Sequence, residues 1–269
     1  MSVRYGDSDG PFVVPHRAGA ALATENTWEG AARSVALGHR YLETDARTTR
    51  DGVVVAFHDR TVTRLAGVPG EIAAMTWDQV RSMRLHGGGR VARLADLLAT
   101  WPEVRWTVDV KDPATLPALV DVLTTTGATR RVCLAGTRDR WLTAARAGLG
   151  DGVSTALGWE SIAALVAGGP FRLPPHTPRF VHLPWWLVRH AGVRGVVQRA
   201  HDAGLRTVVW GVDDAATMHH LLDRGVDGLI SDRADTLREV LLARGRWVPA
   251  PLTPPRVAPG RRAPARPRP

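Results

Sequence analysis

The chain contains almost no lysine, asparagine or cysteine. Of its 35 basic residues only Lys111 is a lysine, and Asn26 is the only asparagine in 269 residues. This resembles the drift of a G+C-rich genome, in which arginine replaces lysine wherever an ordinary surface cation is enough. Lysine presents a compact point charge and arginine a bulky planar fork, so a lysine that survives is one that arginine cannot replace. Unless this single lysine is an accident, both residues mark a functional site, since acidic residues and histidines surround them.

Other absences limit the class of protein. The single cysteine, Cys133, excludes a disulfide framework and fits a reducing compartment. It lies in a run, 131–135, that reads as a strand, so we expect it to be buried packing. Residues 1–7 have no apolar core like that of a signal peptide, and no run approaches the ~20 apolar residues of a membrane span. The expectation is a soluble, cytoplasmic protein.

The positive charge is concentrated at the C-terminal end. No acidic residue follows Glu239, whereas seven arginines do, and without them the net charge falls from +9 to +2. Residues 247–269 are mainly Pro, Ala and Arg and cannot bury enough surface to fold. We therefore predict a folded domain over 1–246 and a disordered tail over 247–269. The tail could weakly contact an anionic membrane; no specific nucleic acid and no obligate protein partner are predicted.

The domain alternates β-rich runs with helical stretches. The predicted strands are Phe12–Val14, Tyr41–Asp45, Trp106–Val110, Val132–Ala135, Val153–Leu157, Phe180–Leu183, Thr207–Trp210 and Gly228–Ser231. The predicted helices are Thr27–Leu37, Leu116–Thr124, Arg138–Ala147, Glu160–Ala167, Val193–Ala203, Ala215–Arg224 and Ala234–Ala243, with glycines at the helix ends at Gly38, Gly148, Gly204 and Gly225. Eight such units predict an α/β fold of the (β/α)8 TIM barrel type. A doubly wound sheet is the alternative, but no Gly-x-Gly-x-x-Gly follows the first strand.

The second crossover is longer than the others. Asp51-Gly52 predicts a hairpin turn before the apolar run 53–57, and helical stretches follow at 76–83 and 94–99. We therefore expect a small hairpin and helix insertion after the second strand, at the mouth of the barrel.

Chemically active side chains collect at the predicted strand ends, where a TIM barrel places its catalytic groups. They are His16, Arg17, Glu43, Asp45, His58, Asp59, Asp109, Lys111 and Trp210. Residues i and i+2 of a strand share a face, so Glu43 and Asp45 point inward together. The same holds for Asp109 and Lys111.

Three inward carboxylates repel one another unless a cation lies among them, and an all-oxygen site suits Mg²⁺ or Ca²⁺ rather than zinc. Arg17 and Lys111 supply positive charge for an anionic substrate, and two histidines titrate near neutral pH. Together these groups describe phosphodiester chemistry. Each signal alone is weak: Glu-x-Asp is common on surface strands, His58 with Asp59 could be a local pair, and Trp210 could be core. The inference rests on their convergence.

The order of these motifs resembles the glycerophosphodiester phosphodiesterase family. The resemblance runs collinearly from about residue 13 to 242. It is carried by His16-Arg17, Glu25-Asn26-Thr27, Gly38, Glu43-Thr44-Asp45, Thr48, Asp51-Gly52, His58-Asp59-Arg60, Gly70-Glu71-Ile72, Met75-Thr76-Trp77, Trp210-Gly211-Val212-Asp213-Asp214, Gly225-Val226-Asp227-Gly228 and Ser231-Asp232.

The resemblance implies a (β/α)8 barrel and assigns roles. It makes Glu43, Asp45 and Asp109 the ligands of Mg²⁺ or Ca²⁺. His16 and His58 become the acid/base pair, Arg17 and Lys111 the phosphate-binding cations, and Trp210 an aromatic wall beside the glycerol. Glu25 and Asn26 would support these groups, with Glu25 orienting Arg17 or His16. The family mechanism uses the glycerol 2-hydroxyl as nucleophile and then hydrolyses a cyclic phosphate.

Several positions depart from the family pattern. Ala18 replaces a glycine, Thr24 a proline, Asp213 an asparagine, and Asp109 is one methylene shorter than the usual glutamate. The usual Pro-Thr-Leu-Glu stretch is replaced by residues 91–96. None of these changes removes a catalytic functional group, so we expect an active enzyme.

The predicted function is metal-dependent hydrolysis of glycerophosphodiesters to glycerol 3-phosphate and an alcohol. One alternative is a lysophospholipase D-type enzyme acting on lipids at a membrane surface, suggested by the basic tail and by Trp185-Trp186. Another is a non-catalytic barrel that binds phosphorylated ligands.

Overall fold

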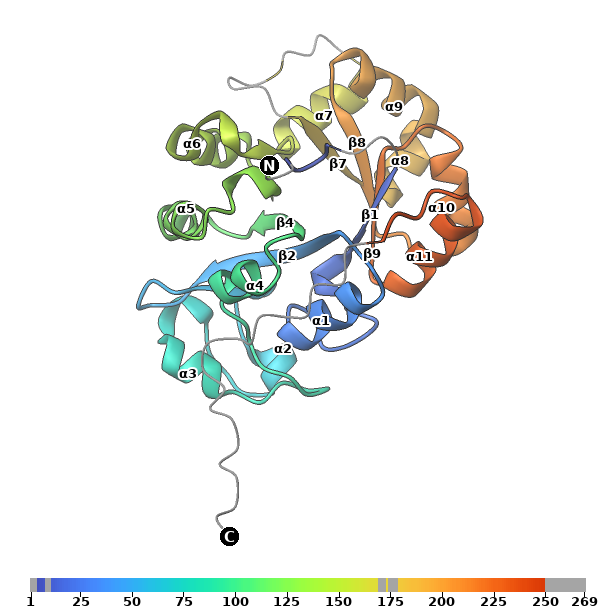
Figure 1. Ribbon diagram of the computed structural model, residues 1–269. Coiled ribbons are helices and arrows are strands. Elements are labelled where there is room, and N and C mark those ends of the chain that lie inside the picture. The colour runs from blue at the N-terminus through green and yellow to red at the C-terminus, as the bar shows by residue number, and fades with distance from the viewer. Residues whose placement is uncertain (1–3, 8–10, 169–172, 174–178, 250–269) are drawn as a thin grey trace.

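The computed structural model describes residues 4–7, 11–168, 173 and 179–249. Eight parallel strands surround a central axis, with helices outside them (Figure 1). The strands are β1 (Phe12–Pro15), β2 (Tyr41–Thr48), β4 (Arg105–Val110), β5 (Val132–Gly136), β6 (Ser154–Thr155), β7 (Phe180–Pro184), β8 (Arg206–Trp210) and β9 (Gly228–Ser231). All eight coincide with predicted strands to within a few residues at each end.

The strands form two sheets that face one another. One has the order β1-β9-β8-β7, and the other has β2-β4-β5-β6 with the antiparallel β3 (Val54–Ala56) at its edge. A parallel bridge between Ala156 and Phe180 joins β6 to β7. At the other seam β1 lies beside β2. The predicted (β/α)8 arrangement is therefore present, and the doubly wound alternative is wrong.

The helices form the outer layer. They are α1 (Trp28–Ala36), α5 (Leu116–Thr125), α6 (Asp139–Leu149), α7 (Trp159–Ala167), α8 (Trp185–Ala191), α9 (Val193–Asp202), α10 (Ala215–Leu222) and α11 (Ala234–Ala243). The short helix α8 was not predicted, because Trp and Val next to a strand also fit extended structure. The predicted helix end at Gly148 is wrong: α6 continues to Leu149, and Gly150 (φ 69°) follows it.

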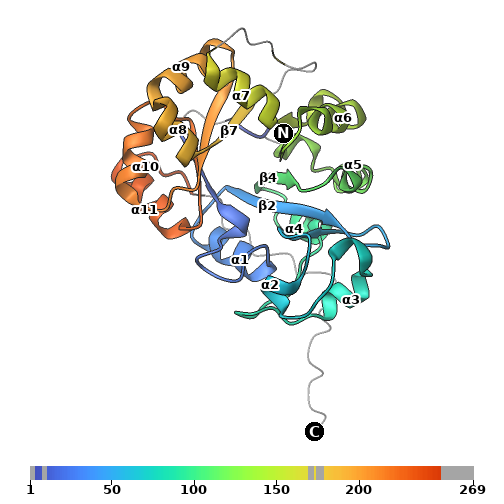
Figure 2. The same cartoon turned by 180° about the vertical axis from the view of Figure 1, so that it is seen from behind.

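The insertion after β2 packs as a small unit beside the barrel. It contains β3, α2 (Thr63–Ala66), α3 (Trp77–Ser82) and α4 (Leu94–Thr100). The predicted hairpin is confirmed, since Ala46 pairs with Ala56 across it. The insertion lies near α1 (Figure 2) and has its own apolar core, made by Val55, Phe57, Val62, Leu65, Ile72, Val80, Leu85 and Val91.

An aromatic cluster closes the barrel at the amino-terminal ends of its strands. The fully buried Tyr5 packs edge-on against Phe12, Tyr41 and Phe180, with ring centroids 5.2–6.1 Å apart. Cys133 lies in the same inner cluster, and burial raises the pKa of its thiol, which confirms the predicted packing role. This cluster fills the amino-terminal end of the barrel interior.

Residues 247–249, which the sequence assigned to the tail, contact the barrel. The Trp247 ring packs edge-on against His39 at 5.0 Å, and Arg40 donates to the Pro249 carbonyl at 2.7 Å. The rest of the predicted tail, 250–269, lies outside the described residues, as does any contact it makes with a membrane. Among the helices the structure describes, none is long and apolar enough to cross a bilayer.

Candidate active site

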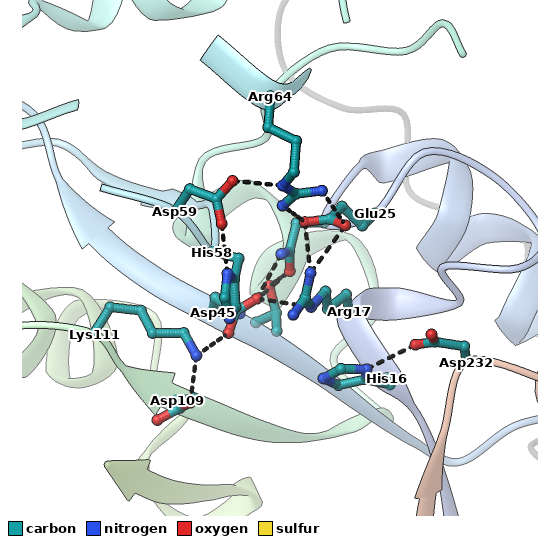
Figure 3. Close-up of polar contacts among 12 residues, drawn as sticks. His16, Arg17, Glu25, Asp45, His58, Asp59, Arg64, Asp109, Lys111 and Asp232 are labelled. Carbon is teal, nitrogen blue, oxygen red and sulfur yellow. Dashed lines mark hydrogen bonds and ion pairs between the residues drawn. The ribbon is translucent and has the colours of Figure 1, made fainter. Parts of the chain in front are cut away.

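A cavity of about 170 Å³ opens at the carboxyl ends of the strands. Seven of the ten predicted site residues line it: His16, Arg17, Glu43, His58, Asp109, Lys111 and Trp210. Asp45, Glu25 and Asn26 contact these residues from behind. The fold thus brings all ten together from β1, β2, β3, β4, β8 and the loops that follow them, and Figure 3 shows the charged part of the group.

The three carboxylates come from two adjacent strands. Asp45 on β2 is the ladder partner of Asp109 on β4, and Glu43 stands two residues before Asp45 on the same face. Glu43 and Asp45 are almost fully buried. Burial and the neighbouring Asp45 raise the pKa of Glu43 to about 7, although His16, the Arg17 amide and Lys111 favour its ionised form. Glu43 is therefore the carboxylate of the three whose ionised form is least favoured in this structure.

Lys111 lies between two of the carboxylates (Figure 3). Its Nζ is 2.6 Å from Asp109 Oδ2 and 2.8 Å from Asp45 Oδ1. Burial opposes the charge on Lys111, but the two carboxylates raise its pKa well above the ordinary value. In return, the Lys111 charge outweighs burial and holds the pKa of Asp45 below its ordinary value.

Asn26 fixes the orientation of Asp45. Its amide nitrogen donates to Asp45 Oδ2 at 2.7 Å, and its amide oxygen accepts from Thr44 Oγ1 and from the Asp45 amide. The residue is buried and has φ 58°, a left-handed conformation that asparagine tolerates better than most residues. A donor, an acceptor and this backbone conformation at one position account for the asparagine.

Each histidine is held by an aspartate. His16 Nδ1 lies 2.7 Å from Asp232 Oδ1, and His58 Nδ1 lies 2.7 Å from Asp59 Oδ1. His16 Nε2 is 3.9 Å from Glu43. Burial lowers the pKa of His16, but Glu43 and Asp232 together raise it above the ordinary value. With Nδ1 engaged, each imidazole keeps Nε2 for proton transfer.

Asp232, and the residues Asp213 and Ser231 that hold its turn, were not predicted as site residues. Ser231-Asp232 nevertheless carried part of the resemblance. Asp213 accepts from Ser231 Oγ at 2.7 Å and from the Asp232 amide at 3.0 Å. The aspartate that replaces the usual asparagine therefore retains the acceptor that positions this turn. The serine and aspartate at a strand end were the available signal.

A chain of ion pairs connects His58 to Arg17 (Figure 3). Asp59 accepts from Arg64 at 2.6 Å, Arg64 donates to Glu25 at 2.6 and 3.0 Å, and Glu25 accepts from Arg17 at 2.9 and 3.0 Å. These arginines outweigh burial and lower the pKa of Glu25. The sequence reasoning missed Arg64, because nothing distinguishes it among 34 arginines; only the folded insertion brings it beside Glu25.

The loop after β1 has an unusual backbone. Arg17 (φ 47°) and Ala18 (φ 63°) both adopt left-handed conformations, which glycine adopts without strain. The Arg17 amide donates to Glu43 Oε2 at 2.6 Å. Ala18 thus occupies a position where the glycine usual in the family removes strain, and it is fully buried, so its methyl group recovers some packing.

The opposite side of the cavity carries little charge. It is formed by Leu157, Trp159, Ile162, His182, Trp210 and Ile230. Trp186, on α8, is 54% exposed and stacks on Trp159 with centroids 6.4 Å apart, whereas Trp185 packs against the outer core. Trp159 and His182 were not predicted: a single aromatic or histidine near a strand is more often packing, and no spacing sets these two apart.

The donor set suits a hard divalent cation. Glu43, Asp45 and Asp109 offer oxygens from one face of two neighbouring strands, and a cation among them would favour the ionised form of Glu43, whose pKa burial and Asp45 raise. Within the part of the chain that the structure describes, no three His, Cys, Asp or Glu side chains are arranged to hold a metal ion. The Lys111 ammonium lies between Asp45 and Asp109, so a metal held there requires Lys111 to move.

Two aspartate-held histidines, two cations and neighbouring carboxylates at the carboxyl ends of the strands of a (β/α)8 barrel are typical of one class of protein, the barrel hydrolases of phosphoric esters. The model of the Glycerophosphoryl diester phosphodiesterase family matches residues 16–236. The chain is 34% identical over 257 residues to the Mycobacterium tuberculosis protein named probable glycerophosphodiester phosphodiesterase 2, covering 91% of this chain and 95% of that one. This protein therefore belongs to the glycerophosphodiester phosphodiesterase family, and it is an enzyme of that family.

Two further similarities are to a solved structure and to a human protein. The structure of the Oleispira antarctica phosphodiesterase OLEI02445, in complex with the product sn-glycerol-3-phosphate, superposes with a TM-score of 0.72 at 18% identity and covers 86% of this chain and 97% of that chain. Human lysophospholipase D GDPD3 is 29% identical over 109 residues, 36% of this chain and 34% of that protein. The first supports the barrel fold.

Proposed function

We propose that this protein is a metal-dependent glycerophosphodiester phosphodiesterase that releases glycerol 3-phosphate and an alcohol. One observation carries the proposal: two aspartate-held imidazoles, two cations and the carboxylates of Glu43 and Asp109 face a single cavity at the carboxyl ends of the strands, with Asp45 directly behind Lys111. The family membership and the product bound to the Oleispira antarctica relative support the choice of substrate.

Each residue has a role in the proposal. Arg17 and Lys111 bind the phosphodiester oxygens. The imidazoles of His16 and His58, through Nε2, take the proton of the glycerol 2-hydroxyl and give a proton to the departing alcohol. The 2-hydroxyl oxygen bonds to phosphorus as the bond to the alcohol breaks, and water then opens the cyclic phosphate.

Glu43, Asp45 and Asp109 would hold Mg²⁺ or Ca²⁺, which stabilises negative charge on the phosphoryl oxygens when bound. Because Lys111 now joins Asp45 to Asp109, we infer that it turns from the carboxylates toward the phosphate when the cation and substrate are bound. Trp210 lies beside the glycerol carbon chain. Glu25 and Asn26 hold Arg17 and Asp45 in place.

The test is release of glycerol 3-phosphate from glycerophosphocholine, with and without EDTA, by the wild-type protein and by Glu43→Gln. Activity that EDTA abolishes, that added Mg²⁺ or Ca²⁺ restores and that the variant lacks supports the proposal. Equal activity after exhaustive chelation overturns the metal requirement, and no release under any condition overturns the activity.

A lysophospholipase D activity is the second candidate. The exposed Trp186 beside the cavity mouth and the partial similarity to human lysophospholipase D GDPD3 favour it. Release of choline from lysophosphatidylcholine, compared with release from glycerophosphocholine in the same assay, distinguishes the two.

A further inference from the structure

His182 is a buried polar side chain in the lining of the cavity. It lies on β7, is only 8% exposed, and lines the cavity. Its Nε2 is buried and has no hydrogen-bond partner among the described residues. An unmade hydrogen bond in a buried position costs about 1–3 kcal/mol, so such a group needs an explanation.

The side chains of β7 point alternately toward the outer core and toward the barrel interior, and this sets the position of His182. Val181 and Leu183 pack into the outer core under the helices, whereas Phe180 packs into the inner aromatic cluster. His182 therefore points inward, one step above Phe180, with the two rings 6.4 Å apart. Below it the cluster around Tyr5 fills the barrel interior. His182 thus lies where the cavity ends.

His182 offers hydrogen bonds without charge, unlike Arg17 and Lys111 on the other side of the cavity. Burial lowers its pKa to about 4, so at neutral pH the ring is uncharged, with one N–H donor and one acceptor nitrogen. A hydroxyl group, which also donates and accepts, complements such a ring. A phosphodiester offers acceptors only and would use one of the two ring nitrogens, and the cations that suit it lie on the β1, β2 and β4 side.

The cavity also limits the ligand by size. Its volume of about 170 Å³ and the aromatic cluster at its inner end leave room for a small polyol but not for an acyl chain beneath His182. In the proposed reaction the 2-hydroxyl must reach an imidazole Nε2, and that of His16 lies 3.9 Å from the buried Glu43, so the glycerol end enters first and the alcohol faces the mouth near Trp159. The free terminal hydroxyl of the glycerol is then the group nearest His182.

We propose that His182 determines substrate specificity by hydrogen-bonding the free terminal hydroxyl of the glycerol, so that the enzyme prefers unacylated glycerophosphodiesters to lysophospholipids. This rests on the function proposed above. It assigns to the β7 side of the cavity a subsite for a primary hydroxyl group.

The test compares glycerophosphocholine with the phosphocholine ester of propane-1,2-diol, which keeps the 2-hydroxyl and lacks the terminal one. For the wild-type enzyme we expect kcat/KM to be about 10- to 100-fold lower for the second substrate. In His182→Phe, which fills a similar volume without hydrogen bonding, glycerophosphocholine should lose about that factor and the deoxy substrate should lose little. His182→Gln, which keeps a donor and an acceptor, should retain part of the discrimination.

The matched control is His39→Phe. His39 is also a fully buried histidine with a pKa lowered to about 4, but it lies outside this cavity. Its replacement should change the melting temperature and leave the substrate ratio unchanged. A purely structural role for His182 predicts equal losses on both substrates.

The outcomes separate the two proposals. If the wild-type enzyme hydrolyses neither phosphodiester, the proposed function fails. If it hydrolyses both equally well, or prefers lysophosphatidylcholine to glycerophosphocholine, the activity stands and the hydroxyl subsite is overturned. Should His182→Phe not fold, the ratio in the wild-type enzyme and in His182→Gln still decides.

Discussion

Lys111 is the residue whose role depends most on size. Its ammonium fits between Asp45 and Asp109 at 2.8 and 2.6 Å, with the side chain largely buried. A guanidinium is planar and wider, and its charge is spread over three nitrogens. The scarcity of lysine in the sequence and the short contacts in the structure therefore point to the same requirement for a compact cation.

We expect Lys111→Arg to be nearly as damaging to turnover as Lys111→Met, because the larger fork displaces the carboxylates. Steady-state kinetics with glycerophosphocholine, together with a melting curve to show folding, provide the measurement. The control is Arg138→Lys, since Arg138 is exposed and pairs only at the surface with Glu160. Wild-type turnover in Lys111→Arg would mean that the single lysine is an accident of codon usage.

The two aspartate-held histidines, His16 and His58, are expected to contribute about equally to turnover. His16→Ala and His58→Ala should each lower kcat by about 10²–10⁴, the usual effect of positioned acid or base catalysis. A histidine whose alanine variant keeps near-normal turnover is not part of the acid/base pair. His201→Ala is the control, because His201 also pairs with an aspartate, Asp227, but lies outside the cavity.

Glu43 should be costly for folding and necessary for cation binding. Its pKa is raised from 4.5 to about 7, so the folded protein holds a proton that the unfolded chain has lost, and stability falls as the pH rises from about 4.5 to 7. At pH 8 Glu43→Gln should therefore raise the free energy of unfolding in the absence of divalent cations, and calorimetry should show weaker binding of Ca²⁺ or Mg²⁺. A stable variant that binds the cation as tightly as wild type would remove Glu43 from the metal site.

At the level of elements, the insertion after β2 contributes a residue that contacts the site residues. Through Arg64 on α2 it connects Asp59, which holds His58, to Glu25, which holds Arg17. The barrel positions Arg17 and the loop after β3 positions His58, so neither alone fixes their relative orientation. This ion-pair chain supplies that coupling.

Arg64→Ala should lower kcat/KM by about 10-fold although Arg64 does not line the cavity, because residues that orient active groups are typically worth that much. The matched control is Arg60→Ala. Arg60 lies four residues before Arg64, in the loop that leads into α2, but is exposed and pairs with Glu71. If the two variants have equal activity, the ion-pair chain has no role in catalysis.

At the level of the whole molecule, two buried neutral histidines make stability depend on pH. His39 and His182 have pKa values lowered to about 4 by burial, against an ordinary value of 6.5. Between these values the unfolded chain binds protons that the folded protein does not. The contribution of the two buried histidines to the free energy of unfolding is therefore complete above pH 6.5 and is lost as the pH falls toward 4.

We expect each histidine to lower the free energy of unfolding by about 2 kcal/mol between pH 8 and pH 5. Urea unfolding of the wild type and of His39→Gln at both pH values measures this difference. The variant loses the hydrogen bond to the Ala234 carbonyl at both, so only the change with pH is diagnostic. Equal pH dependence in the two proteins would show that His39 is not the source.

The sequence by itself determined the class of fold and the charged half of the site. Eight apolar runs define the strands, and the stretches between them have the period of helices. Both patterns can be read from the sequence because each depends only on residues a few positions apart. Carboxylates two residues apart, such as Glu43 and Asp45, must share a face of any strand. Once the strands lie side by side, their carboxyl ends meet, so the predicted residues converge on one cavity.

Only the tertiary structure decided which groups lie beside these. Asp232 meets His16 across 216 positions of sequence, and Arg64 meets Glu25 across 39. No local pattern encodes such distances, because they follow from barrel closure and from how the insertion packs. The unpartnered Nε2 of His182 is likewise a property of its surroundings. A buried histidine becomes informative only when every neighbour that could have bonded it has been placed.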